Sequence, residues 1–305
     1  MSERIIETCD LHTHSYYSDG SFSPAEIIRL AKESGVSAVA LTDHNTTRGL
    51  YEFISYGSES SGGAKSTVSL ARPGMNSGHQ KITLVAGCEF TTEFEKKEVH
   101  TVGLFLPKAS WPDIEEYVAP MKASKHESNI TLIERLNRGG YDIAYEEVTD
   151  ITDADEFNRA HVARILFKKG YVESVKDAFD KLLFEGGGFF YPPERPDVFE
   201  TIRFIRSCGG VSVLAHPFLN LDEDELRRFI PHAKEEGLSA METRYSKFDA
   251  ADTKRASDLA DEFSLLHSGG SDFHGDAKPG ISLGTGRGDL VVPYRYYEEL
   301  QKIRI

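Results

Sequence analysis

The chain has 305 residues, and 39% of them are hydrophobic, which suffices for one large barrel or for two domains. Its formal net charge of −14 argues against a broad surface for nucleic acids or anionic membranes, although bound metal ions could still attract a small anionic substrate. Three cysteines without paired spacing, no N-terminal signal-peptide core and no apolar run of transmembrane length predict a cytoplasmic protein.

Seven apolar runs are typical of strands buried in a parallel sheet. Helical patterns lie between most of them, for example after Ser23, a predicted N-cap that precedes Pro24. This alternation predicts an α/β fold of βα units around a barrel, and only seven strands predict a distorted one. The expected strands are Ile5–His12, Ala38–Thr42, Ile82–Glu89, Val99–Leu106, Val211–Ala215, Ser239–Thr243 and Ser264–His267, and the expected helices include Pro24–Ala31, Asp222–Glu236 and Asp249–Phe263.

Two regions interrupt the alternation. Residues 57–78 are rich in Ser and Gly with little apolar periodicity, so we expect a mobile loop insertion. Residues 111–191 lack barrel strands but show helical spacing of apolar residues at Ile130–Leu136 and Val162–Phe167. We therefore expect a barrel built from residues 1–110 and 192–305, with residues 111–191 forming an inserted helical subdomain over the barrel mouth.

His and Asp residues stand at the ends of several predicted strands. The stretches Asp10–His14, Thr42–His44 and Ser271–His274 all follow this pattern, and barrels place their active sites at the C-terminal ends of strands. The pair His12 and His14 points both imidazoles to one side of an extended chain, where one metal ion can take both. A single His is more often a core or surface residue, but clusters on several strands favour a metal site.

His100 opens its strand instead of closing it. About ten residues separate it from Glu89, which is too few for a parallel crossover of a dozen or more. The two strands should therefore form a hairpin that returns His100 to the same mouth. The complete set of candidate metal ligands is His12, His14, Asp19, His44, Glu89, His100, His216, Asp272 and His274.

Nine nitrogen and oxygen ligands exceed the needs of one ion. Two or three divalent ions are therefore expected, with one carboxylate bridging. The absence of a thiolate from the set disfavours structural zinc, and mixed imidazole and carboxylate ligands suit Zn, Mn or Fe. Clustered divalent ions are typical of hydrolysis by a metal-activated hydroxide, and phosphate esters suit such a site best.

These same residues resemble a known family. Seven motifs occur in the order found in the PHP (polymerase and histidinol phosphatase) family of metal-dependent phosphoesterases, and the resemblance covers nearly the whole chain. It implies a distorted (β/α)7 TIM-like barrel. The motifs are His12-Thr13-His14, Ser18-Asp19-Gly20, Thr42-Asp43-His44, Gly87-Cys88-Glu89, Val99-His100, Ala215-His216-Pro217 and Ser271-Asp272-Phe273-His274.

The resemblance also implies how the ligands are shared. The first metal would be held by His12, His14, Glu89 and Asp272. Glu89 would bridge to a second metal, completed by His100 and His216. The third would be held by Asp19, His44 and His274, where Asp19 replaces a His found in some relatives.

Substrate contacts are expected from two further stretches. Asn158–Arg164 resembles a segment of the branch that acts on nucleotide monophosphates and bisphosphates, which implies phosphate binding by Arg159 and His161, and less directly by Arg164. The alternative is a solvated helix face. Glu242 and Arg244 close the sixth predicted strand, and for them substrate contact and buried structural pairing both stay open.

The expected function is hydrolysis of a small phosphomonoester, with an AMP-like nucleotide favoured and phosphate as a product. Glu89, His216, Asp272 and His274 are the candidate catalytic residues, and His216 or His274 would protonate the leaving oxygen if it is not fully committed to metal. Alternatives are a histidinol-phosphate, sugar-phosphate or cyclic-phosphate hydrolase, or a non-enzymatic module of the PHP type. An amidohydrolase acting on C–N bonds is disfavoured because no Lys closes a strand.

Overall fold

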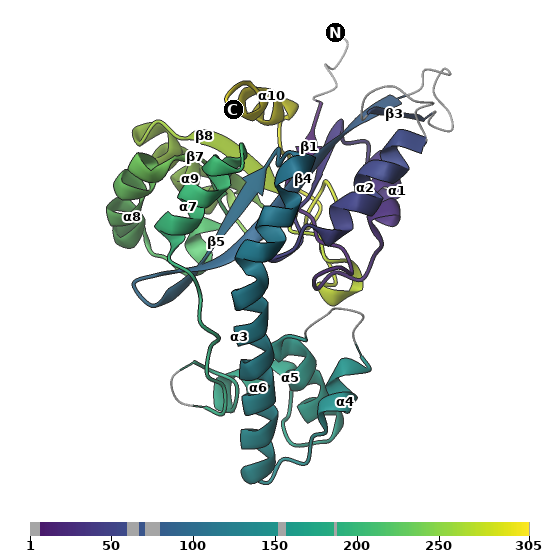
Figure 1. The fold of residues 1–305 in the computed structure, drawn as a ribbon, viewed down its shortest axis with the longest axis vertical. Coiled ribbons are helices and arrows are strands. Elements are labelled where there is room, and N and C mark those ends of the chain that lie inside the picture. Colours follow the sequence, from purple (N-terminus) through teal and green to yellow (C-terminus); the bar gives the residue numbers. More distant parts are fainter. Residues whose placement is uncertain (1–6, 60–66, 71–79, 152–156, 186–187, 305) are drawn as a thin grey trace.

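A nearly closed barrel of seven strands forms the body of the protein in a computed structural model that describes residues 7–59, 67–70, 80–151, 157–185 and 188–304 (Figure 1). The first and last strands approach each other at Leu11, whose N–H donates to the Gly269 carbonyl oxygen at 3.1 Å, and this closes the sheet. The strand order is β1 (Cys9–Asp10), β2 (Ala38–Leu41), β4 (Gln80–Phe94), β5 (Lys97–Leu104), β6 (Val211–Leu214), β7 (Leu238–Tyr245) and β8 (Leu266–Gly270).

In the described residues a strand overlaps each of the seven expected ranges, although β1 is only two residues long and β4 continues to Phe94. The distortion of the barrel lies at β5. This strand runs antiparallel to both β4 and β6, whereas the other neighbouring pairs in the order are parallel. The β4–β5 connection is a two-residue turn, Glu95 and Lys96, with φ values of 49° and 66°. Two positive φ values are typical of the tight hairpin turns whose twist matches that of the strands. The predicted hairpin is therefore confirmed.

Helices cover the outside of the sheet (Figure 1). The first, α1 (Pro24–Ser34), begins at Ser23, which forms a capping box with Glu26, and ends at Gly35 with φ of 78°. Such caps satisfy the free N–H and C=O groups at the two helix ends. The remaining helices of this layer are α2 (Arg48–Glu59), α7 (Val198–Ser207), α8 (Glu223–Glu236) and α9 (Ala250–Glu262).

The barrel interior is filled by small apolar side chains on alternating strand positions. Ala38, Ala40 and Val213 face inward, and the aromatic rings of Tyr296 and Tyr297 pack against the same cluster. These tyrosines belong to α10 (Tyr294–Lys302), which closes one end of the barrel (Figure 1). The opposite end is left for the polar strand ends. Within the described ranges, every helix is too short or too polar to cross a membrane.

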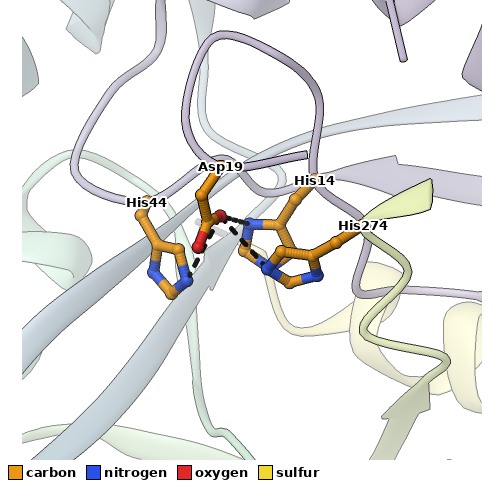
Figure 2. A group of neighbouring side chains, drawn as sticks. All are labelled: His14, Asp19, His44 and His274. Atoms are coloured by element: carbon orange, nitrogen blue, oxygen red, sulfur yellow. Dashed lines mark ion pairs between the residues drawn. The ribbon is translucent and has the colours of Figure 1, made fainter. Parts of the chain in front are cut away.

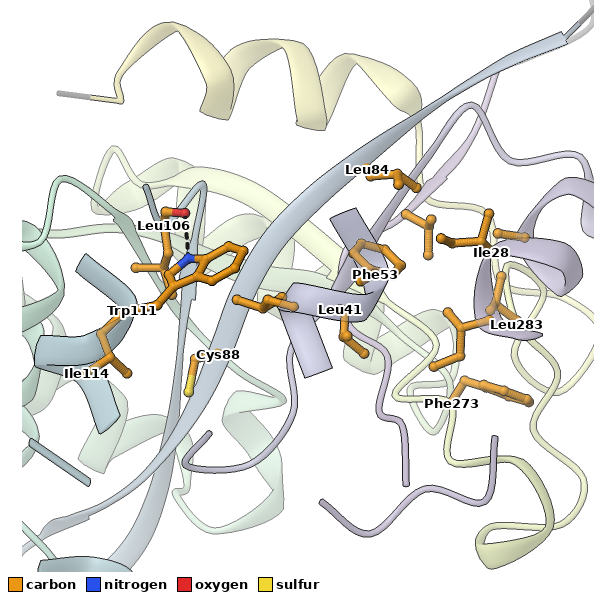
Figure 3. Close-up of a cluster of buried hydrophobic side chains, with 14 of the residues drawn as sticks. Ile28, Leu41, Phe53, Leu84, Cys88, Leu106, Trp111, Ile114, Phe273 and Leu283 are labelled. Carbon is orange, nitrogen blue, oxygen red and sulfur yellow. Dashed lines mark hydrogen bonds between the residues drawn. The ribbon is translucent and has the colours of Figure 1, made fainter. Parts of the chain in front are cut away.

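The segment between β5 and α7 is helical and projects from the barrel (Figure 1). It contains α3 (Trp111–Arg138), α4 (Tyr145–Thr149), α5 (Arg159–Lys168) and α6 (Val175–Lys181). The first turns of α3 pack on the barrel, where Trp111 and Ile114 join the cluster that contains Leu41 (Figure 3). Its last turns, with Leu132 and Leu136, join a separate core with α5 and α6. One long helix therefore belongs to both parts.

The Ser- and Gly-rich segment 57–78 contains more regular structure than its composition predicts. Helix α2 reaches Glu59, and β3 (Thr67–Leu70) pairs antiparallel with β4. Pairing with the long strand β4 gives β3 its backbone hydrogen bonds. The Ser-rich sequence alone does not predict this strand. The rest of the expected loop, residues 60–66 and 71–78, lies outside the described residues. The structure therefore does not test the prediction that this loop is mobile.

Candidate metal centre

All nine predicted metal ligands meet at the open end of the barrel. They form four overlapping groups in which the potential ligand atoms lie within 4.8 Å of one another. Most of these side chains follow the end of a strand, but Glu89 lies within β4, Asp19 in the loop after β1 and His100 within the hairpin strand β5. The groups are His14, Asp19, His44 and His274; His12, His14 and Asp272; His12, Glu89 and His216; and His44, Glu89 and His100.

Glu89 lies at the centre of this arrangement and is fully buried. Its two carboxylate oxygens face different imidazoles. Oε1 lies 2.8 Å from His100 Nδ1 and 3.0 Å from His216 Nε2. Oε2 lies 3.0 Å from His12 Nε2, 3.1 Å from His14 Nε2 and 3.2 Å from His44 Nδ1. A carboxylate divided in this way has the arrangement that a bridge between two ions requires.

The charge state of Glu89 also suits a ligand. Burial by itself would raise the pKa of this carboxyl, but His44, His12 and His100 hold it well below its usual range. An ionised carboxylate with no access to water needs a compensating charge close by. The imidazoles supply part of that compensation, and a divalent ion would supply it more fully.

A second group surrounds Asp19 (Figure 2). Its Oδ1 lies 3.1 Å from His274 Nε2, 3.8 Å from His44 Nε2 and 3.9 Å from His14 Nδ1. Among the residues that the structure describes, Oδ1 of Asp19, both ring nitrogens of His14 and Nε2 of His274 are buried without a hydrogen bond. Buried polar atoms are normally satisfied, so donor atoms that converge without hydrogen bonds fit a bound cation.

Asp272 is held by two residues that the sequence does not single out. Its Oδ2 accepts hydrogen bonds from Tyr245 Oη and Lys278 Nζ, both at 2.9 Å. The other oxygen, Oδ1, faces His14 Nε2 at 3.5 Å and His274 Nδ1 at 3.4 Å. One oxygen is therefore fixed by protein donors while the other is left for the metal side.

Glu242 occupies the layer behind the histidines. Its Oε1 lies 2.9 Å from His12 Nδ1, and its Oε2 accepts the backbone N–H of His216 at 2.7 Å. Carboxylates commonly fix the orientation of metal-binding histidines in this way. Because both oxygens are engaged and the residue is buried, the structure favours the structural alternative for Glu242 over substrate contact.

Two buried aspartates fix the loops that carry the ligands. Asp10 accepts hydrogen bonds from the N–H and Oγ of Ser271 at 2.8 and 2.6 Å, next to Asp272. Asp43 accepts from Oγ of Ser15 and of Ser18, both at 2.7 Å, beside Asp19. Burial raises the pKa of Asp43 to about 6 although these hydrogen bonds lower it. Both residues stand in the His-rich motifs, but the sequence alone gave them no separate role.

A cavity of about 420 Å³ lies between the barrel mouth and the helical segment. Its volume is within the range of small-molecule sites. Three candidate metal ligands, Asp19, His44 and His100, line this cavity. Its other lining residues include Lys122, Lys125, Asn158, Arg159 and Arg195, so positive charge surrounds the candidate ligands.

Arg159 and Asn158 bring α5 to this cavity. The guanidinium of Arg159 donates to the Leu183 carbonyl oxygen at 3.1 Å and lies 4.2 Å from the ring centre of Phe190. Asn158 caps α5 and also donates from Nδ2 to Asp19 Oδ2 at 3.4 Å. The side chain of Arg159 therefore lines the cavity together with candidate metal ligands, which favours phosphate binding over a solvated helix face.

His161, Arg164 and Arg244 lie elsewhere. Nδ1 of His161 accepts the backbone N–H of Asn158 at 3.1 Å and completes the helix cap, and burial lowers its pKa to about 4. Arg164 donates from Nη2 to the Ala277 carbonyl oxygen at 3.2 Å. Arg244 is half-buried on β7. None of the three is among the described side chains that line the cavity, so the geometry favours structural roles for them.

Curated relatives align with most of the chain. The 5'-3' exoribonuclease Rnm of Escherichia coli is 30% identical over 276 residues, which cover 90% of this chain and 87% of the relative. A 5'-3' exoribonuclease of Haemophilus influenzae is 32% identical over 87% of this chain and 89% of its own length. The 3',5'-nucleoside bisphosphate phosphatase of Chromobacterium violaceum is 26% identical, covering 90% of each chain.

Solved structures share the fold. A candidate metal-dependent phosphoesterase from Bifidobacterium adolescentis superposes with a TM-score of 0.76 at 25% identity, covering 99% of this chain and 98% of that one. An amidohydrolase from Chromobacterium violaceum, solved with sulfate and no metal, gives a TM-score of 0.78 at 24% identity over 97% and 98% of the two chains. The second likeness concerns the fold alone.

The family model described as the PHP domain matches residues 10–188. This range contains six of the nine candidate ligands, and the other three closely follow β6 and β8. The chain therefore belongs to the PHP domain family and is a metal-dependent phosphoesterase with a distorted TIM-like barrel.

Proposed function

We propose that the protein hydrolyses the phosphomonoester of a nucleotide mono- or bisphosphate and releases phosphate. The observation that carries this proposal is the placement of Glu89, whose two oxygens face two separate groups of histidines, of which His44 and His100 line a cationic cavity. Two or three Mn, Zn or Fe ions suit these nitrogen and oxygen donors. The nine candidate ligands would be divided among these ions as the family resemblance implies, with Glu89 as the bridging carboxylate.

Such ions, when bound, supply an acidified water and neutralise charge on the phosphoryl group. The chain's own contribution is to hold and orient the substrate. Arg159 presents a guanidinium to the cavity that His44 and Asp19 also line. A planar guanidinium can donate two parallel hydrogen bonds to phosphate oxygens. Lys122 and Lys125 on α3 add positive charge along the same wall.

His216 and His274 are better placed as ligands than as acids for the leaving oxygen. In His274, Nδ1 lies 2.9 Å from the Asp272 carbonyl oxygen and Nε2 lies 3.1 Å from Asp19 Oδ1. In His216, Nε2 faces Glu89 Oε1. Both rings are therefore committed to the carboxylate cluster, so we propose that neither protonates the product.

A second candidate is the stepwise removal of nucleotides from the 5′ end of an RNA. The names of the Escherichia coli and Haemophilus influenzae relatives favour it. The net charge of −14 disfavours an extended nucleic-acid surface, but the cavity requires only a short 5′-phosphorylated end. Cyclic phosphates are a further alternative, since a cyclic-phosphate diphosphodiesterase of Eggerthella lenta is 28% identical.

The deciding experiment compares these substrates on one preparation loaded with Mn²⁺. Phosphate release would be measured with adenosine 5′-monophosphate, adenosine 3′,5′-bisphosphate, histidinol phosphate and a sugar phosphate. Ring opening would be measured with a cyclic phosphate, and mononucleotide release with a 5′-phosphorylated oligoribonucleotide. The proposal expects the two nucleotides to be turned over best. A higher kcat/KM on the oligoribonucleotide would establish the second candidate instead.

The position of bond cleavage gives an independent test. In solvent enriched with ¹⁸O, the label should enter the released phosphate, because the attack is at phosphorus. Label in the alcohol product would show attack at carbon and would contradict the proposal. A protein that binds Mn²⁺ but turns over none of the substrates would favour the non-enzymatic binding module. We also propose a cytoplasmic location, in line with three free cysteines, of which Cys9 and Cys88 are buried.

A further inference from the structure

We propose that Glu98 and Arg195 are positioning residues that fix the orientation of His100 as a metal ligand. Neither belongs to the nine-residue ligand set. The inference rests on the proposed metal binding by His100 and Glu89, and it adds two residues from outside the family motifs. It also connects the metal centre to the segment that returns from the helical insertion.

The first step is the contact between Glu98 and His100. Nδ1 of His100 lies 2.8 Å from Glu89 Oε1, and its Nε2 lies 3.0 Å from Glu98 Oε1. One ring nitrogen is therefore directed to the metal side and the other to a carboxylate. Metal-binding histidines usually place the second N–H on such a carboxylate, which fixes the tautomer and the ring plane.

Strand geometry explains why Glu98 is in place. Glu98 and His100 are two residues apart on β5, so their side chains leave the strand on the same face. The same face lines the cavity, where both residues are found. A carboxylate at this position can reach the outer nitrogen of the imidazole without any change in the backbone.

The second step is the contact between Arg195 and Glu98. Nη2 of Arg195 lies 2.5 Å from Glu98 Oε2, the oxygen that does not contact His100. The Arg195 side chain is only 4% exposed, whereas most arginines in proteins are exposed. The Glu98 side chain is half-buried, and its ion pair restricts the carboxylate to one orientation because the buried Arg195 guanidinium would be costly to leave unpaired.

Arg195 also contacts the insertion. The same Nη2 lies 3.0 Å from Glu185 Oε1, and Glu185 in turn lies 3.6 Å from Arg159 Nη2. Nε of Arg195 is buried and has no hydrogen-bond partner in the described part of the chain. One guanidinium is therefore shared between the barrel strand that carries His100 and the wall that carries Arg159.

The test measures Mn²⁺ binding to metal-free protein by isothermal titration, which requires no substrate. Glu98→Ala should weaken one class of sites by about tenfold to a hundredfold while the other class is unchanged. Glu98→Gln keeps an acceptor for His100 but loses the ion pair, so its effect should be smaller. Arg195→Ala should weaken the same class of sites, and Arg195→Lys should restore part of the affinity.

A double variant separates positioning from general damage. If Arg195 acts through Glu98, then Glu98→Ala with Arg195→Ala should be no weaker in Mn²⁺ binding than Glu98→Ala alone. Glu194→Gln, an exposed carboxylate next to Arg195, is the matched control and should bind as the unchanged protein does. Thermal unfolding of each variant checks that the fold is retained.

The outcomes distinguish this inference from the proposed function. Unchanged Mn²⁺ affinity in Glu98→Ala, or an equal loss at every site, would overturn the positioning role even in a protein that hydrolyses nucleotides. A loss at one class of sites would support it even if no nucleotide is turned over, in which case the proposed function fails separately.

Discussion

The barrel mouth and the helical insertion both line one cavity, but sequence position predicts the location of a side chain better at the mouth than in the insertion. At the mouth, most candidate ligands lie on strands or soon after them, and these side chains have little freedom because their backbone lies in or beside the sheet. In the insertion, the helix of Asn158–Arg164 presents side chains all around its axis, so neighbours in sequence reach different places. Arg159 lines the cavity, whereas His161 caps the helix.

A motif is therefore more informative on a strand than on a helix. Alternation along β5 directs Glu98 and His100 to one face, and the same rule holds for His12 and His14 after β1. On α5, three polar residues within six positions have three partners: Arg159 contacts Leu183, His161 contacts Asn158 and Arg164 contacts Ala277.

The largest expected effect is on the barrel side, at Glu89. Glu89→Gln keeps the volume of the side chain but removes the charge that would bridge two ions. Several kcal/mol of charge stabilisation should be lost, so kcat should fall roughly a thousandfold or more, and bound metal should fall with it. Metal analysis and turnover on the best nucleotide check this.

Glu93→Gln is the matched control for this change, because Glu93 lies four residues later on the same strand and outside the ligand groups. It should keep both metal and turnover. Retention of metal content and activity in Glu89→Gln would remove the central carboxylate from the mechanism, and the contrast between the two regions would no longer hold.

On the insertion side, Arg159→Ala should lower kcat/KM while metal content stays intact. Losing one charged hydrogen bond to phosphate costs about 1.5–3 kcal/mol, or roughly ten- to a hundredfold in kcat/KM. Arg138→Ala, on the last turn of α3 with a side chain 76% exposed, is the control and should change neither quantity.

Two other outcomes for Arg159→Ala would change the interpretation. Unchanged kinetics on several phosphorylated substrates would show that the insertion is a structural cap. Loss of metal would show that α5 supports the metal site instead of the substrate. The contact of Asn158 with Asp19 provides a direct route for such an effect.

The fold and the convergence of the candidate ligands were predictable because both depend on local patterns. Apolar runs defined the strands, the short distance from Glu89 to His100 required a hairpin, and parallel strands bring their C-terminal ends to one edge. The seven strands and the approach of all nine ligands follow from these rules.

The residues behind the ligands were not predictable in the same way. Arg195 pairs with Glu98 although 97 positions separate them (195 − 98), and Tyr245 reaches Asp272 from another strand. Such pairs depend on how distant segments pack, and no spacing in one sequence reports them. The strand β3 was missed for a related reason, because its partner β4 supplies the hydrogen bonds that its own composition does not favour.

The smallest expected effect is that of replacing His161. It distinguishes a role in capping α5 from a contact with the substrate. Nδ1 of His161 accepts the N–H of Asn158, as the third helical residue does in a capping box. His161→Ala should therefore lower the free energy of unfolding by about 1 kcal/mol, the usual value of a lost cap, with little change in kcat/KM. His161→Gln provides the sharper comparison, because Gln at this position can accept the same N–H and should restore most of the stability. Denaturant unfolding and steady-state kinetics on both variants measure the two quantities. If His161 instead contacts the phosphate, His161→Gln would keep its stability and lose kcat/KM, and the helix would then present two substrate contacts instead of one.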